Sequence, residues 1–93
     1  MTDHNAPTRI TWDKPTEEKL FKILEQIPDM IRGIAEARVC RKAEDIVRAQ
    51  NRWVIEEKDM IDAFFAETPG GFMPLMKNSM RELGIDYTKF GHS

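Results

Sequence analysis

The feature that most constrains the fold is a proline that precedes a long stretch with helical spacing. Pro28 opens the segment PDMIRGIAEARVCRKAEDIVRAQN, in which apolar residues recur at helical intervals as far as Asn51. Proline pushes the residue before it out of the α region, and its missing N–H has no partner to lose in the first turn of a helix. The sequence therefore predicts one helix that ends at Ile27 and a second, long helix that starts at Pro28.

The apolar face of this long helix changes side along its length. At ~100° per residue, the helix carries two apolar faces that differ by more than ~90°. They are formed by Met30, Ile31, Ile34 and Ala37, and by Val39, Ala43, Ile46 and Val47. Because one flat partner would not need this rotation, we expect two. The preceding helix would cover the N-terminal half and the following helix the C-terminal half, while a kink near Gly33 is the alternative.

The preceding helix has clear start signals. Asp13 can accept the free N–H groups of its first turn, and Pro15 is tolerated in that turn. Its apolar positions follow i, i+3, i+4, i+7 spacing, at Leu20, Ile23, Leu24 and Ile27. These residues predict one amphipathic helix before Pro28.

Two further helices are expected after the long one. Asn51 can end the long helix in a left-handed conformation. A turn, 52–55, then leads to a third helix, 56–67, whose first residue, Glu56, is a poor cap. Its inward residues would be Met60, Ile61, Phe64 and Phe65. Pro69-Gly70-Gly71 stops it, and a fourth helix runs from about Met73 to Gly84, followed by a loose tail, 86–93.

These elements predict an all-α protein with a three-helix core, a long central helix and a fourth, C-terminal helix. We expect a flexible N-terminal tail at 1–10 and a helical domain at 11–67. A Pro-Gly-Gly hinge, the last helix and a tail would occupy 68–93. Met76, Met80 and Leu83 share one face of that helix, which suits either its own core or a partner helix.

Length and charge exclude several classes of protein. The 93 residues suffice for one domain, and the net charge of −2 argues against a general nucleic-acid binder. No apolar run approaches the ~18 residues of a membrane span, and no secretory signal is present at the start. The single cysteine, Cys40, cannot form an internal disulfide, which is typical of a cytoplasmic protein.

The sequence offers no pattern for catalysis or metal binding. Its two histidines, His4 and His92, fall in the expected tails, and Cys40 has no Cys or His partner at ligand spacing. Gly70-Gly71 does not follow a strand, so it indicates a turn and not a phosphate loop. We therefore expect no enzyme activity from the chain alone, no metal site and no cofactor bound by this chain alone.

Arginines on the long helix are the main candidate binding residues. Four of them fall close together, with Asp45 among them and Lys42 beside them: Arg38, Arg41, Arg48 and Arg52. One interpretation is a solvated face with ion pairs such as Arg41 with Asp45. The other is an anion site, because the planar guanidinium binds carboxylates with two hydrogen bonds. Since the apolar N-terminal half continues into this strip, the surface could hold a flat hydrophobic ligand that carries carboxylates.

The segment TWDKPTEEKLFKILEQIPDMIRGIAE resembles the small C-terminal domain of the B subunit of light-independent protochlorophyllide reductase. The matching residues are Trp12, Leu20, Leu24, Ile27, Pro28, Ile31 and Arg32, followed by a second patch at Glu44, Ile46, Val47, Asn51, Val54 and Ile55. The resemblance covers about 10–66, and the extension from Thr68 onward lies outside it. The large nitrogenase-like part of that reductase component, with its cofactor and cluster residues, has no counterpart in this sequence.

The resemblance implies a non-catalytic accessory module of a tetrapyrrole-reducing, nitrogenase-like complex of chlorophyll biosynthesis. It implies a protein partner, a tetrapyrrole as the candidate ligand, and Arg32 as a residue that contacts ligand or partner. An ion pair between Arg32 and Glu36 is the structural alternative for that residue. A homo-oligomer is compatible with this role. The competing hypothesis is a small regulatory or DNA-associated, histone-like module, which a short-long-short order of helices with arginines would suit.

Overall fold

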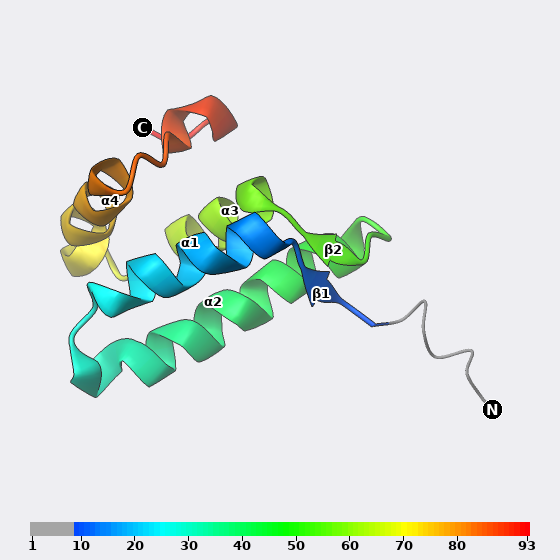
Figure 1. Ribbon diagram of the computed structural model, residues 1–93, viewed down its shortest axis with the longest axis horizontal. Coiled ribbons are helices and arrows are strands. Elements are labelled where there is room, and N and C mark those ends of the chain that lie inside the picture. The colour runs from blue at the N-terminus through cyan, green and yellow to red at the C-terminus, as the bar shows by residue number, and fades with distance from the viewer. Residues whose placement is uncertain (1–8) are drawn as a thin grey trace.

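The computed structural model describes residues 9–93, which form four α-helices and two very short strands (Figure 1). The expected tail at 1–10 falls outside the described residues except for Arg9 and Ile10, and His4 also lies outside them. The all-α class is confirmed, with α2 as the long central helix. No helix between residues 9 and 93 is both long and apolar enough to cross a lipid bilayer.

Helix α1 spans Lys14–Glu25 and begins as the sequence predicts. The Asp13 carboxylate accepts hydrogen bonds from the Thr16 backbone N–H and from its hydroxyl, at 3.3 and 2.8 Å. The helix ends two residues before Ile27, and the chain turns at Pro28, which caps α2, Asp29–Ala49. Helix α2 is one unbroken α-helix, so no break at Gly33 accounts for its two apolar faces.

The core lies between the second half of α2, α3 (Glu57–Glu67) and α1. Its buried members from α2 are Val39, Ala43 and Val47, and those from α3 are Met60, Ile61, Ala63 and Phe64. Helix α1 adds Leu20, Ile23 and Leu24. The expected packing of the C-terminal half of α2 against the helix that follows it is confirmed, because α2 makes far more close contacts with α3 than with any other element.

The expected packing of α1 over the N-terminal half of α2 is wrong. Met30 is 92 % exposed and Ile34 is 60 % exposed, so most of that apolar face has no cover within the described chain. Helix α1 makes few close contacts with α2 and contributes its apolar face to the shared core instead. The apolar pattern revealed a second face correctly but could not reveal that this face stays open.

Two short parallel strands were not expected from the sequence. β1 is Thr11–Trp12 and β2 is Val54–Ile55, with Thr11 opposite Val54 and Trp12 opposite Ile55. Further hydrogen bonds join Thr11 N–H to the Trp53 carbonyl and Asp13 N–H to the Ile55 carbonyl, at 2.9 and 3.0 Å. Pairs this short leave no periodic signal, so the turn predicted at 52–55 is half strand.

The boundaries of the later elements follow the predicted turns. Asn51 has φ of 58°, the left-handed conformation expected after α2. The start of α3 is better capped than Glu56 suggested, because the Asp59 carboxylate in its first turn accepts the Glu56 backbone N–H at 2.9 Å. After the 3-10 turn Gly70–Phe72, helix α4 spans Met73–Glu82.

Helix α4 packs onto the core through its methionines. Met80 is fully buried and Met76 nearly so, which favours packing of this face on the protein's own core over contact with a partner helix. Gly84 has φ of 75°, and Ile85 N–H bonds the Met80 carbonyl at 2.8 Å, as expected for a Schellman-type end. In Figure 1, α4 lies at the end of the molecule where α1 turns into α2, far from the strands.

The expected loose tail at 86–93 is wrong. A 3-10 helix spans Tyr87–Phe90 and packs against α3, with the Tyr87 side chain buried. The His92 ring stacks on Phe65, with centroids 4.0 Å apart and an angle of 11° between the rings. The segment 86–93 is short and mostly polar, so Tyr87 and His92, which hold it against α3, gave no periodic signal in the sequence.

Candidate ligand-binding cleft

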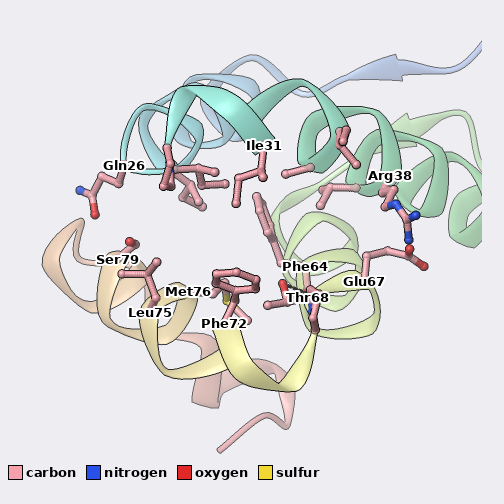
Figure 2. Close-up of a pocket in the computed structure, with 17 residues that line it drawn as sticks. Gln26, Ile31, Arg38, Phe64, Glu67, Thr68, Phe72, Leu75, Met76 and Ser79 are labelled. Carbon is pink, nitrogen blue, oxygen red and sulfur yellow. Dashed lines mark hydrogen bonds between the residues drawn. The ribbon is translucent and has the colours of Figure 1, made fainter.

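An open apolar cleft of about 320 Å³ lies where the uncovered half of α2 faces α4 (Figure 2). The end of α1, the corner that leads into α2, and the end of α3 complete its walls. Most of the lining side chains are apolar: Ile23, Ile27, Pro28, Ile31, Ile34, Ala35, Val39, Phe64, Pro69, Phe72, Leu75 and Met76. Its volume lies at the lower end of the range for small-molecule sites.

The cleft exists because of how α1, α3 and α4 are placed around the first half of α2. α3 ends at Glu67, before it reaches the first half of α2, and α1 turns its buried side chains to the core and not over the outer face of that half. Pro69 and the following 3-10 turn then carry the chain to α4, which places Phe72 and Leu75 opposite α2. Figure 2 shows Phe64, Phe72 and Met76 gathered on one side, with Ile31 pointing towards them from α2.

The sequence did not identify the α4 wall of the cleft. Phe72 and Leu75 are 48 % and 47 % exposed, although both are large apolar residues. A signal was present, because Leu75 lies beside the buried Met76 on a helix that already buries an apolar face. Only the position of α4 in space shows that these side chains face α2.

One end of the cleft is charged. Arg38 from α2 and Glu67 from α3 line the cleft and face each other there (Figure 2). Within residues 9–93, no acidic side chain lies within ion-pair distance of the Arg38 guanidinium. A guanidinium at the rim of an apolar cleft can bind the carboxylate of a ligand whose apolar part enters the cleft. Of the five candidate arginines, only Arg38 lines this cleft.

Arg32 stabilises the corner between α1 and α2. Its guanidinium donates to the carbonyls of Leu24, Glu25 and Ile27 at 2.8, 3.3 and 2.9 Å. These carbonyls lie in the last turn of α1 and in the corner after it, and the Leu24 carbonyl also accepts the Ile27 backbone N–H at 3.0 Å. Arg32 also pairs with Asp29 at 2.9 Å, not with Glu36 as the structural alternative expected. These contacts account for Arg32 as a structural residue.

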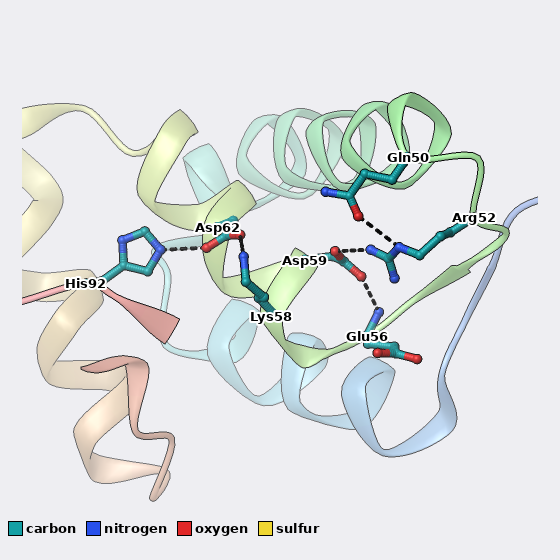
Figure 3. A network of polar contacts seen from close by, with 7 residues as sticks. All are labelled: Gln50, Arg52, Glu56, Lys58, Asp59, Asp62 and His92. Atoms are coloured by element: carbon teal, nitrogen blue, oxygen red, sulfur yellow. Dashed lines mark hydrogen bonds and ion pairs between the residues drawn. The ribbon is translucent and has the colours of Figure 1, made fainter. Parts of the chain in front are cut away.

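The remaining arginines are divided between α2 and the turn after it. Arg48 pairs with Glu44 at 3.9 Å and with Asp45 at 3.3 Å, so Asp45 is paired with Arg48 and not with Arg41. Arg41 lies exposed on α2. Arg52 turns back to α3 and binds the buried carboxylate of Asp59 (Figure 3). That carboxylate therefore has a guanidinium on one oxygen and the Glu56 N–H on the other.

A second polar network closes the C-terminal segment onto α3 (Figure 3). His92 Nε2 lies 2.6 Å from Asp62 Oδ1, and the Lys58 ammonium donates to Asp62 Oδ2 at 2.7 Å. Burial pushes the pKa of Asp62 up, but hydrogen bonds from Lys58 and His92 outweigh it and hold that pKa below its ordinary value. The group fastens 86–93 to the face of α3 that carries Phe65.

Cys40 lies half-buried on α2 between its two halves. Burial, together with the negative charges of Glu36 and Glu44, raises the pKa of its thiol to about 11. The thiol is therefore protonated at neutral pH and packs as a small apolar group. Across residues 9–93, no group of three or more His, Cys, Asp or Glu side chains has the arrangement of a metal site.

Comparisons with models of known protein families, with curated proteins and with solved structures found no match to this chain.

Proposed function

We propose that this chain is a non-catalytic binding module and that the cleft between α2 and α4 is its binding site. The observation that carries the proposal is an open apolar cleft with the Arg38 guanidinium at its charged end. Its mostly apolar lining suits retention of a hydrophobic molecule better than proton transfer or nucleophilic attack. The ligand class that fits is an apolar molecule with a carboxylate.

The resemblance to the small C-terminal domain of a light-independent protochlorophyllide reductase suggests a tetrapyrrole as the first ligand to test. Tetrapyrroles combine a flat apolar ring with carboxylate side chains, which is the combination that the cleft and Arg38 would recognise. Because the cleft is small and open, it would hold one edge of the ring and leave the rest exposed. A docked ring could then be passed to a reductase-like partner complex.

The test is a titration of the full chain with protoporphyrin IX, followed by the absorbance of the porphyrin and by tryptophan fluorescence. Arg38→Ala should weaken binding about tenfold, because it removes a charged hydrogen-bonding partner of the carboxylate. Leu75→Glu should weaken binding as much or more, because it places a carboxylate in an apolar wall. Arg41→Ala is the matched control, since Arg41 is an exposed arginine of the same helix that does not line the cleft.

Two results would contradict the proposal. One is equal affinity of wild type, Arg38→Ala and Leu75→Glu for the porphyrin, which would place any binding elsewhere. The other is the absence of a spectral change with wild type at concentrations where porphyrin alone stays monomeric. Circular dichroism of each variant would show that the helices are intact.

A further inference from the structure

The outer face of the first half of α2 carries an apolar ridge that extends beyond the proposed ligand site. Met30 is 92 % exposed and Ile34 is 60 % exposed, and they lie one helical turn apart. Gly33 and Ala37, which are also exposed, lie on the same face. Ile34 belongs to both features, because it also lines the cleft. The ridge, Met30 and Ile34, and the cleft are therefore adjacent parts of one surface.

Exposed apolar residues concentrate at this end of the described chain. Residues 9–93 have seven exposed large apolar side chains, and four of them belong to the ridge or the cleft wall: Met30, Ile34, Phe72 and Leu75. Single exposed apolar residues are ordinary, but a contiguous group of them marks an interaction surface. The second apolar face of α2, which α1 leaves uncovered, is part of this group.

The shape of this surface fits a copy of itself. An apolar ridge beside an apolar hollow is complementary to the same surface rotated by a twofold axis, because each ridge then meets the other copy's hollow. If the axis passes through Ile34 and the two α2 helices run antiparallel, positions one turn before and one turn after Ile34 face each other. Met30 of one copy then lies opposite Arg38 of the other, at the charged end of the cleft.

The residue types at this contact suit such a pairing. Methionine is flexible and polarisable, so the Met30 side chain can adapt to a shallow hollow. The aliphatic stem of Arg38 can pack against it while the guanidinium stays in water. The charges around the ridge are of both signs, with Asp29 and Glu36 beside Arg32 and Arg41, so like charges do not dominate the surface.

We propose that a second copy of this chain occupies the cleft, with its Met30 and Ile34 ridge in the hollow between α2 and α4. The dimer is symmetric, and Ile34 of each copy lies at the axis. It is weak and concentration-dependent, because only a few large apolar side chains form the contact and stable interfaces usually bury about 800 Å² on each partner. The dimer needs no ligand, but it shares the cleft of the proposed function, so ligand and second copy compete.

Sedimentation velocity over a wide range of protein concentration tests the self-association. Wild type should shift from monomer to dimer as concentration rises, and Met30→Glu with Ile34→Glu should stay monomeric. Both substitutions fall on exposed positions, and circular dichroism would verify that they leave the helices intact. Val54→Glu is the matched control, because Val54 is also an exposed apolar residue but lies beyond the opposite end of α2. A monomer at every concentration, or equal association of the ridge variant, overturns the proposal.

Disulfide trapping tests the geometry. In a Cys40→Ser background, Ile34→Cys should form an interchain disulfide under mild oxidation about tenfold faster than Val54→Cys, because a residue on the axis meets its own copy. Equal rates for the two variants would show that Ile34 is not at the axis and would overturn the proposed contact.

A third measurement separates this proposal from the proposed function. If both hold, excess protoporphyrin IX should return the dimer to monomer. If the porphyrin binds and the dimer persists, the second copy does not occupy the cleft, and the proposed contact is overturned. If the porphyrin does not bind, the proposed function fails, while the concentration series and the trapping result still decide whether the dimer exists.

Discussion

The two halves of α2 belong to the same unbroken helix but have opposite surroundings. The second half buries Val39, Ala43 and Val47 against α3 and the rest of the core. The first half leaves Met30 and Ile34 in solvent and forms one wall of the cleft. Both halves have apolar residues at helical spacing, so apolar spacing alone does not distinguish a face for folding from a face for binding.

What distinguishes the halves is how their neighbouring helices cover them. α3 packs on the second half of α2 and ends at Glu67, before the chain turns away through Pro69. Helix α1 turns its apolar residues to the core and is fixed to the corner by Arg32. The first half of α2 keeps its position because it continues the packed second half of the same helix. Its exposed apolar face is free to contact another molecule.

The largest expected effect on stability comes from the same substitution, isoleucine to alanine, made once in the core and once in the open first half of α2. Ile61→Ala in the core should lower the free energy of unfolding by about 3 kcal/mol, because Ile61 is fully buried and its loss leaves a cavity. Ile34→Ala in the open region should cost less than about 0.5 kcal/mol. Urea denaturation at low protein concentration would measure both values. Similar losses in the two variants would mean that the first half of α2 is packed in solution.

The next effect compares two arginines near the end of α2. Arg52→Ala should lower the free energy of unfolding by about 2 kcal/mol, because it removes the cationic partner of the buried Asp59 carboxylate. Arg48→Ala should change it by less than about 0.5 kcal/mol, since the pairs of Arg48 with Glu44 and Asp45 are exposed. Thermal unfolding followed by circular dichroism would rank them, and an equal loss would contradict a structural role for Arg52.

The smallest effect on stability at neutral pH concerns Cys40, between the two halves. Its neutral thiol is favoured in the fold, so this contribution is present below the ordinary pKa of 9.0 and is lost as pH rises towards about 11. At pH 8 the folded protein should hold about a hundredfold less thiolate than the unfolded chain and alkylate correspondingly slowly.

The pH profile of Cys40 alkylation by iodoacetamide would measure this pKa. Glu36→Gln should lower the midpoint, because the charge of Glu36 helps to raise the pKa of the thiol. Glu25→Gln, on α1, serves as the control and should leave the midpoint unchanged. A wild-type midpoint near 9 would mean that this part of α2 is open to solvent.

Much of the fold could be predicted from the sequence because local signals set the helix ends. Asp13, Pro28, Asn51 and Gly84 each act within one turn of the backbone, and the structure places all four where their chemistry requires. The cap of α3 was missed because the capping carboxylate belongs to Asp59, a residue within the first turn of the helix, and not to the residue that precedes the helix. Its signal, an acidic residue three positions after Glu56, is visible in the sequence.

The candidate site could be predicted only in part. The second apolar face of α2 and its continuation towards Arg38 were visible from periodicity. The α4 wall depends on the direction in which the chain leaves Pro69, which no local signal gives. The contacts of Arg32 with the end of α1 and of His92 with Asp62 depend on the tertiary arrangement, so neither follows from spacing along one helix.

The strand pair has a consequence for the order of folding. β1 and β2 join parts of the chain that are about 40 residues apart, and closing a loop of that length costs entropy before the few hydrogen bonds form. α2 and α3 are consecutive along the chain and share the most contacts, so they can pair first. We expect the strands to form late, after the transition state, so that weakening them would speed unfolding while leaving the folding rate almost unchanged.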